Sequence, residues 1–240
     1  MIAGQVLRAI LFDFNGVLVD DEALHQALFA RVLREEGLSL RDEDFFANHL
    51  GLDDRRCFAA ALQESSRPFE QPHLMRLIAR KASYYQESIR SHGFQFFPGA
   101  IELVREAAGS GLTLGVVTGA LRAEVEGALR HAGIAALFKA IVAAEDVNEG
   151  KPSPEGYLRA LDELNGLPPF PPRLFHPHEV LAVEDSLWGL EAATGAGLVT
   201  LGVAHSYPAA ALESAHLVVP DLAGLRLESL FEALAEASRA

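Results

Sequence analysis

Several reactive side chains in this sequence come directly after short apolar runs. Asp13 and Thr118 each end such a run, and the neighbours Glu184 and Asp185 end another. Lys151 lies in a Gly-Lys-Pro-Ser-Pro turn that follows a fourth run. Apolar runs of this length are typical of buried strands, and the carboxyl ends of parallel strands meet at one edge of a sheet. We therefore expect two or three carboxylates, a hydroxyl and an ammonium group in one crevice.

These groups predict a site for phosphoryl chemistry. Crowded carboxylates repel one another unless a cation joins them, and Mg²⁺ prefers oxygen ligands of this kind. A phosphoryl group near that ion would meet the Thr118 hydroxyl, the Lys151 ammonium and backbone N–H groups at Gly119, where we expect a helix to begin. Positioning and charge neutralisation are most of what phosphoryl transfer needs. Asp13 is then free to act as a covalent nucleophile.

The segments that must position these groups alternate between strands and helices. After a first strand that ends at Asp13, strands are predicted at 112–117, 138–143, 180–183, 199–203 and 217–219, and helices at 122–132, 154–164, 187–196 and 222–237. Strands separated by single helices imply a parallel sheet covered on both faces. Between 21 and 93, in contrast, only helices are predicted, at 21–36, 41–48, 54–63 and 72–91. The sequence therefore predicts an α/β protein with a helical insert after the first strand.

Length and composition restrict the class of protein. The 240 residues form one large domain or two small ones, and 50% hydrophobic residues can fill a sizeable core. A net charge of −13 argues against a nucleic-acid surface and against binding to an anionic membrane. The single cysteine, Cys57, permits no intrachain disulfide and is interpreted as a small buried residue. No membrane span or signal peptide is evident, so we expect a cytoplasmic protein.

One segment has a biased composition. Residues 167–178 read Leu-Pro-Pro-Phe-Pro-Pro-Arg-Leu-Phe-His-Pro-His, which predicts a stiff loop between a helix and the next strand. Such a loop lies at the amino end of the sheet, opposite the edge where Asp13 is expected. A neutral insertion is the favoured interpretation, followed by a contact or oligomer role, and then by catalysis.

The ordered set of motifs resembles the haloacid dehalogenase-like hydrolases, in the branch of phosphoglycolate phosphatase and β-phosphoglucomutase. The segments that carry the resemblance are L-F-D-F-N-G-V-L-V-D, V-V-T-G, G-K-P-S-P-E-G-Y and V-E-D-S-L-W-G-L-E-A-A-T-G-A-G. The likeness covers nearly the whole chain. It implies a Rossmann-like catalytic core at 1–20 and 94–240, with an inserted all-helical cap domain at 21–93.

The resemblance also implies a role for each motif residue. Asp13 would be the nucleophile and a Mg²⁺ ligand, and Lys151 would neutralise the nucleophile and the phosphate. Thr118 would bind phosphate together with Gly119. The metal ligands would be Asp13, the backbone carbonyl of Asn15, Asp185 and the nearby Glu184. The implied activity is that of a Mg²⁺-dependent phosphatase acting on a small phosphorylated metabolite. We expect a monomer or homodimer.

Residues of the insert are candidates for substrate specificity. Gly51, in the segment H-L-G-L-D-D-R, resembles the specificity loop of the family's cap. Arg55 or Arg56 could reach an anionic substrate from there. His25, on the first helix of the insert, matches a position that is often His in this branch.

Asn15 departs from the pattern, because phosphatases of the family have aspartate at this position. That aspartate protonates the leaving group and then activates water, and an amide can do neither. Loss of a general acid/base costs about 10²- to 10⁴-fold in rate. The metal site should survive, because the position contributes only its backbone carbonyl.

Four interpretations of Asn15 remain open. The chain is a phosphatase that is slow or uses good leaving groups, or another residue supplies the acid/base. Candidates for that second case are His25, Glu22, Asp20, Asp21 and His205. Alternatively the chain is a non-catalytic protein that binds a phosphometabolite, or the asparagine was introduced in place of an aspartate to trap a substrate. A phosphosugar mutase resembling β-phosphoglucomutase is a further alternative, and Arg55 or Arg56 would help it.

Overall fold

The computed structural model describes residues 6–38, 53–65 and 70–237. Its core is a six-stranded parallel sheet in the order β3-β2-β1-β4-β5-β6, which confirms the predicted α/β class. The strands are β1 (Ala9–Phe12), β2 (Thr113–Val117), β3 (Phe138–Val142), β4 (Val180–Glu184), β5 (Val199–Val203) and β6 (Leu217–Val219). The predicted helix at 41–48 and the candidate Gly51 lie outside the described residues.

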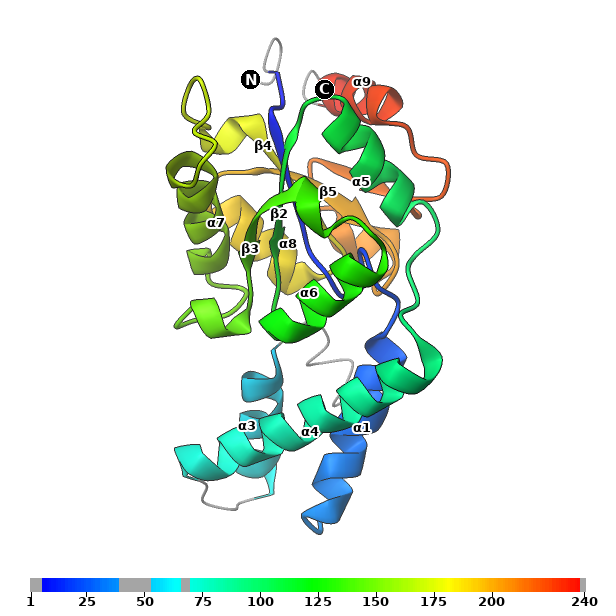
Figure 1. The fold of residues 1–240 in the computed structure, drawn as a ribbon, viewed down its shortest axis with the longest axis vertical. Helices are drawn as coiled ribbons and strands as arrows, with labels where there is room; N and C mark the ends of the chain where they lie inside the picture. Colours follow the sequence, from blue (N-terminus) through cyan, green and yellow to red (C-terminus); the bar gives the residue numbers. More distant parts are fainter. Residues whose placement is uncertain (1–5, 39–52, 66–69, 238–240) are drawn as a thin grey trace.

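Helices cover both faces of the sheet (Figure 1). On one face lie α5 (Ala100–Gly109), α6 (Arg122–His131) and α9 (Leu227–Ala237); on the other lie α7 (Glu155–Gly166) and α8 (Leu187–Gly195). Short 3₁₀ helices are η1 (Ala135–Leu137), η2 (Ala144–Asp146), η3 (Pro177–Glu179) and η4 (Ala209–Leu212). Side chains of β1 alternate between the two cores: Ile10 and Phe12 pack with α5, α6 and α9, and Ala9 and Leu11 pack with α7 and α8.

The strand register brings the candidate residues to one edge. Phe12 at the end of β1 is paired with Val116 of β2 and with Val183 of β4. Asp13 follows Phe12 and Glu184 follows Val183, so Asp13 and Glu184 lie level with each other. Thr118 lies just beyond the end of β2. This arrangement is what the apolar runs predicted.

Three features of the elements differ from the sequence prediction. Helix α5 is absent from the predicted set, although its apolar residues follow a helical spacing. Helix α9 begins at Leu227 rather than at 222, because the chain first forms a turn in which Gly224 has φ +72° and Leu225 N–H bonds the carbonyl of Leu222. Helix α6 begins at Arg122, so Gly119 lies in the preceding turn and not at the helix start.

The inserted helices have a hydrophobic core of their own. Helices α1 (Glu22–Glu35), α3 (Asp54–Glu64) and α4 (Gln71–His92) surround a cluster separate from the two that flank the sheet. The buried members of this cap cluster are Phe29, Val32, Leu33, Phe58, Ala61, Leu62, Leu74, Leu77 and Ile78. The helices lie beyond the carboxyl ends of the strands (Figure 1). Within residues 21–38, 53–65 and 70–93 the structure contains no strand, as predicted.

The two segments that join insert and core lie side by side. Val19 and Phe96 form an antiparallel bridge, and the N–H of Asp20 donates to the carbonyl of Gln95 at 2.9 Å. These contacts lie next to the domain boundaries predicted at 20/21 and 93/94, which stay a prediction. No helix within the described ranges is long and apolar enough to cross a membrane.

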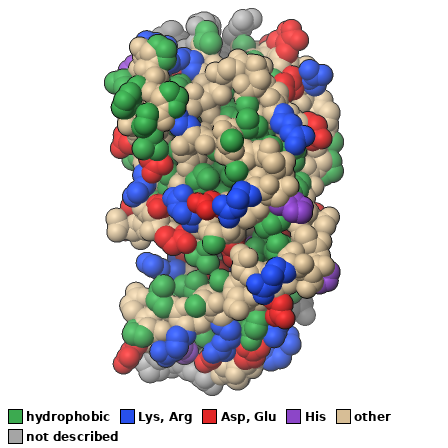
Figure 2. Space-filling view, in the orientation of Figure 1, with side chains coloured by type: hydrophobic (Ala, Val, Ile, Leu, Met, Phe, Trp, Pro, Cys, Tyr) green, Lys and Arg blue, Asp and Glu red, His purple; other side chains and the backbone are tan. Residues whose placement is uncertain are grey.

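The proline-rich loop lies at the amino end of the sheet, as expected. Arg8, just before β1, donates to the carbonyls of Leu174 and Arg173 at 3.0 and 2.9 Å. Phe170 and Leu174 are 70% and 60% exposed. Figure 2 shows hydrophobic side chains gathered over the corner of the molecule where this loop lies in Figure 1. The loop is therefore remote from the edge that carries Asp13.

The separate cap cluster predicts how the insert responds to a cavity. Leu77 is fully buried in that cluster, so Leu77→Ala should lower the free energy of unfolding by about 2–5 kcal/mol. Met75, on the same helix and 49% exposed, provides the matched control, for which Met75→Ala should change stability by less than about 1 kcal/mol. Urea unfolding followed by circular dichroism measures both. Equal effects of the two substitutions would contradict a packed cap core.

Candidate active site

Asp13 begins the site at the end of β1. Its backbone N–H donates to the carbonyl of Val183, and its Oδ1 accepts the N–H of Phe14 at 2.7 Å. The residue is only 8% exposed. Its Oδ2 lies 2.9 Å from Nζ of Lys151, which the loop after β3 brings to the same edge. One carboxylate oxygen is therefore held by the backbone, and the other faces an ammonium group.

Lys151 connects Asp13 to Glu184. Its Nζ lies 2.6 Å from Oε1 of Glu184, which also accepts the hydroxyl of Tyr157. Burial alone would lower the pKa of Lys151, but the charges of Asp13 and Glu184 raise it above its ordinary value. The lysine is therefore charged, and two carboxylates from different strands hold it in place.

Three buried carboxylates meet beside this lysine. Oxygens of Asp13, Glu184 and Asp185 lie within 4.8 Å of one another. Burial, together with the charge of Asp13, raises the pKa of Glu184 to about 7 and that of Asp185 well above its usual range. A bound cation would relieve this repulsion, and an all-oxygen donor set suits Mg²⁺. The residues present fit that ion, and Glu184 differs from the other two because its Oε1 bonds Tyr157 as well as Lys151.

A tight turn lets Asp185 approach the nucleophile segment. Gly16 has φ +76°, and a Cβ there would lie 1.9 Å from Oδ2 of Asp185. The same Oδ2 accepts a hydrogen bond from Oγ of Ser206. His205, which the sequence suggested as an acid/base, donates from Nδ1 to the carbonyl of Gly16 at 2.8 Å and stacks on Phe97 at 3.8 Å between ring centroids. His205 therefore holds the turn.

Thr118 and Gly119 line the cavity that opens above Asp13. The Thr118 N–H donates to the carbonyl of Val142, and its Oγ1 accepts the N–H of Ala120 at 3.0 Å. The hydroxyl hydrogen of Thr118 is thus available for an anionic oxygen. The cavity holds about 200 Å³ between core and cap. Its lining includes the candidates Asn15, His25, Arg55, Lys151 and Asp185.

Asn15 is held by a neighbouring carboxylate. Its Nδ2 donates to Oδ1 of Asp21 at 2.8 Å and lies 3.3 Å from Nε2 of His25. Oδ2 of Asp21 accepts the hydroxyl of Tyr85 at 2.6 Å. Burial would raise the pKa of Asp21, but the hydrogen bonds from His25, Tyr85 and Asn15 lower it. The ionised Asp21 is therefore complementary to an amide at position 15, whereas an aspartate there would place two carboxylates in contact.

His25 extends this network into the cap. Its Nε2 lies 3.3 Å from Oδ2 of Asp21, and its Nδ1 lies 2.6 Å from Nζ of Lys81. Lys81 in turn lies 2.5 Å from Oδ1 of Asp54. Burial and the Lys81 charge would lower the pKa of His25, but Asp21 more than offsets them, so the pKa is raised. The predicted candidate His25 thus reaches the cavity as part of a charged group of residues.

Lys81, Tyr85 and Ser206 were not predicted from the sequence. Lys81 and Tyr85 continue the apolar spacing of Leu74, Leu77 and Ile78 on α4. A lysine on the apolar face of an amphipathic helix is a signal that could have identified it, since lysine is almost never fully buried unless it is paired. Ser206 carries no such signal, because only the fold brings the loop after β5 to Asp185.

The two arginines of the cap have different positions. Arg55 is exposed at the cavity, as expected for a group that contacts substrate. Arg56 instead donates from Nη1 to the carbonyl of Lys151 at 2.7 Å. Asp53 caps helix α3 by accepting the N–H of Arg56. Arg56 therefore joins the cap to the loop that carries Lys151.

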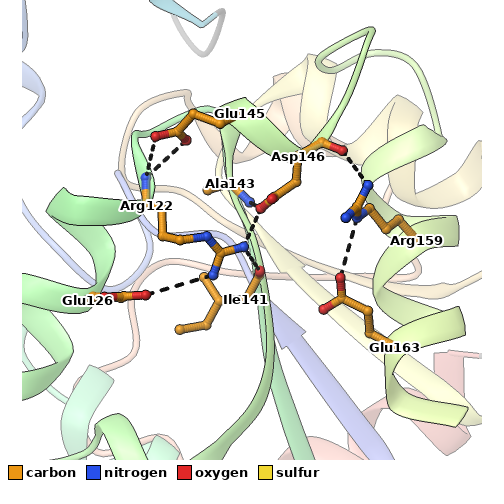
Figure 3. Close-up of polar contacts among 8 residues, drawn as sticks. All are labelled: Arg122, Glu126, Ile141, Ala143, Glu145, Asp146, Arg159 and Glu163. Carbon is orange, nitrogen blue, oxygen red and sulfur yellow. Dashed lines mark hydrogen bonds and ion pairs between the residues drawn. The ribbon is translucent and has the colours of Figure 1, made fainter. Parts of the chain in front are cut away.

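The loop between β3 and Lys151 is fixed by a second set of charges (Figure 3). Arg122, the first residue of α6, contacts the carboxylate of Asp146 and donates to the carbonyl of Ile141 at 2.7 Å. Its backbone N–H donates to Glu145. Arg159 of α7 donates to the carbonyl of Asp146 at 2.7 Å. These bonds tie the loop to helices on both faces of the sheet.

Comparison with known proteins agrees with this geometry. The sequence model of the haloacid dehalogenase-like hydrolase family matches residues 10–203. Validoxylamine A 7'-phosphate phosphatase of Streptomyces hygroscopicus subsp. limoneus is 29% identical over 91% of this chain and 96% of its own length. Protein CbbY of Rhodobacter capsulatus is 32% identical over 80% of this chain and 83% of its own length.

A solved structure shares the fold. β-Phosphoglucomutase from Clostridium difficile superposes with a TM-score of 0.83, covering 98% of this chain and 100% of its own, at 23% identity. At 23% identity, this similarity shows the fold alone. Together with the family match and the relatives, it agrees with the motifs and with their placement at one edge of the sheet. The chain therefore belongs to the haloacid dehalogenase-like hydrolase family, in its branch of phosphatases and β-phosphoglucomutase-like proteins.

Proposed function

We propose that this phosphohydrolase is Mg²⁺-dependent and cleaves a small phosphorylated metabolite through an aspartyl-phosphate on Asp13, with a weakened acid/base step because of Asn15. The observation that carries the proposal is the Asp13 carboxylate, 2.9 Å from the Lys151 ammonium and clustered with two further buried carboxylates. Relatives named for the phosphatase reaction support the same chemistry. The cytoplasmic location and the monomeric or homodimeric state stay predictions.

The residues perform the reaction in two displacements. An oxygen of Asp13 attacks phosphorus, the P–O ester bond breaks, and the alcohol leaves as an alkoxide that takes up a proton. Water then attacks the aspartyl-phosphate, which releases inorganic phosphate and restores Asp13. Lys151 and the Thr118 hydroxyl bind the phosphoryl oxygens in both steps. A Mg²⁺ ion held by Asp13, Asp185 and the Asn15 carbonyl would supply charge neutralisation.

Asn15 weakens the protonation of the leaving group. An amide has no proton to give at neutral pH, and its N–H₂ group is already bonded to Asp21. Esters of acidic alcohols, such as aryl phosphates, need little protonation and should be cleaved well. Esters of ordinary alcohols need an acid and should be cleaved slowly. The competing function is a non-catalytic protein that binds the same class of phosphate.

The nucleophile assignment predicts the outcome of an aryl phosphate assay. Asp13→Asn should reduce hydrolysis of p-nitrophenyl phosphate by about 10³-fold or more, because the covalent step is lost. Asp162→Asn, at an exposed position of α7, is the matched control and should retain activity. Release of p-nitrophenolate measures both. Activity that survives Asp13→Asn would exclude Asp13 as the nucleophile, and absence of activity in the natural protein would favour the binding protein.

The carboxylate cluster predicts a coupling between Mg²⁺ and stability. Mg²⁺ should raise the melting temperature of the natural protein, because the ion binds the folded chain and relieves carboxylate repulsion. Asp185→Asn should abolish most of this increase while leaving the metal-free protein at least as stable, since one buried charge is removed. Differential scanning calorimetry with and without Mg²⁺ measures the shift. An undiminished shift in the variant would place the ion elsewhere.

The contact between Asn15 and Asp21 predicts how an aspartate at position 15 would behave. Asn15→Asp should increase kcat/KM for a sugar phosphate by about 10²- to 10⁴-fold, with little gain on p-nitrophenyl phosphate. The Asp21 carboxylate should raise the pKa of the new acid, which then stays protonated to higher pH. The decline of kcat/KM on the alkaline side should therefore begin at a higher pH. In the double variant Asn15→Asp/Asp21→Asn that repulsion is gone, and the alkaline limb should move to lower pH.

Rate profiles from pH 5 to 9 measure this difference. Identical alkaline limbs in the single and double variants would refute the coupling of positions 15 and 21. If neither variant turns over a sugar phosphate faster than the natural protein, the missing-acid account fails and the non-catalytic alternative gains support.

A further inference from the structure

Lys151 is held at its backbone by the cap as well as at its side chain by the core. Its Nζ lies between carboxylate oxygens of Asp13 and Glu184, and its carbonyl accepts a hydrogen bond from Nη1 of Arg56, on α3, at 2.7 Å. Within the described ranges, this is the one hydrogen bond that the Lys151 carbonyl accepts. A residue of the cap is therefore bonded to the residue whose ammonium group faces the nucleophile.

The core holds the same loop at earlier positions. Arg122 contacts the carboxylate of Asp146, and Arg159 donates to the carbonyl of Asp146 (Figure 3). The carboxylate of Glu155 accepts the backbone N–H groups of residues 148 and 149 at 2.8 and 2.9 Å. These contacts end two residues before the lysine, whose own carbonyl is held by the cap.

The start of α3 lies close to two turns that line the cavity. Asp53, the residue before α3, accepts the backbone N–H of Arg56 at Oδ1, and its Oδ2 lies 4.0 Å from Nε of Arg56. A Cβ at Gly150 would lie 2.4 Å from Oδ2 of Asp53, and a Cβ at Gly119 would lie 3.3 Å from Cβ of Asp53. The two glycines therefore let the cap approach both turns, and Asp53 orients Arg56 toward the loop that carries the lysine.

The backbone position of Lys151 matters because its ammonium group is shared between two carboxylates. Nζ lies 2.6 Å from Oε1 of Glu184 and 2.9 Å from Oδ2 of Asp13. When an oxygen of Asp13 bonds phosphorus, Asp13 loses its carboxylate charge, whereas the attraction of Glu184 remains. The ammonium group is then drawn away from the phosphoryl oxygens. A lysine whose carbonyl is fixed by Arg56 resists this displacement.

We propose that Arg56 is a positioning residue of the reaction: through its bond to the Lys151 carbonyl, the cap keeps the Lys151 ammonium beside the nucleophile. The inference rests on the proposed phosphatase function and deepens it. Arg56, unlike Arg55, is not among the described residues that line the cavity, so it acts without touching the substrate. Its effect is the same for different phosphate esters, because it concerns the phosphoryl group and not the leaving group.

The variant Arg56→Met tests this role. Methionine keeps an unbranched side chain with high helix propensity but lacks the guanidinium, and Asp53 still caps α3 through the backbone N–H of residue 56. With p-nitrophenyl phosphate and Mg²⁺, kcat should fall about tenfold, the size of one charge-assisted hydrogen bond, while KM changes by less than about threefold. Acetyl phosphate, which has a different leaving group, should show the same loss. An unchanged kcat would overturn the proposal.

Two further variants separate positioning from folding. Arg56→Lys retains a cationic donor for the carbonyl of Lys151 and should recover most of the natural kcat. Arg76→Met, which replaces an exposed arginine on α4 of the same cap, is the matched control and should leave kcat unchanged. Circular dichroism verifies that all variants are folded to the same extent before rates are compared.

A double-mutant cycle shows whether Arg56 acts through Lys151. Lys151→Met removes the ammonium group, so adding Arg56→Met to this variant should cause no further loss of kcat, because no ammonium is left to position. A further loss of about tenfold would mean that Arg56 acts by another route, and would overturn the inference.

The outcomes distinguish failure of this inference from failure of the function on which it rests. Hydrolysis of p-nitrophenyl phosphate that is equally fast in the natural protein and in Arg56→Met keeps the phosphatase assignment and refutes the positioning role. If the natural protein or Lys151→Met hydrolyses too slowly to measure, calorimetric titration with orthovanadate and Mg²⁺ replaces the rates in the same cycle, because orthovanadate mimics the five-coordinate transition state. Arg56→Met should then weaken binding about tenfold only where Lys151 is present. Binding that is equal in the natural protein and in Arg56→Met, or absent from both, would refute the proposal.

Discussion

The contact of Lys151 with Asp13 and Glu184 is the constraint on which the site depends. Three carboxylates lie buried at one edge of the sheet, and their repulsion would oppose folding without a cation among them. The lysine comes from the loop after β3, which Arg122 and Arg159 tie to helices on opposite faces of the sheet. The charges of β1 and β4 are thus neutralised from a third segment. A phosphoryl group brought there meets an ammonium that the fold has already positioned.

A second constraint acts around position 15. The amide of Asn15 is not a lone substitution in an otherwise ordinary site, because Asp21 accepts its N–H₂ group and is itself bonded by Tyr85 and lies beside His25. An ionised Asp21 favours an amide over a second carboxylate by simple electrostatics. The loss of the general acid and the presence of Asp21 are therefore parts of one local arrangement, which also includes cap residues from α4.

The sequence predicted the sheet and its functional edge because both follow from local rules. Apolar runs ending in Asp13, Thr118 and Glu184 predict strands, and parallel strands deliver their last residues to one edge. What it did not predict depends on contacts between distant segments. Lys81 reaches His25 only because α4 packs on α1, and Ser206 reaches Asp185 only because the loop after β5 folds over the same edge of the sheet. The start of α9 was misplaced because the Gly224 turn shortens an apolar pattern that otherwise continues.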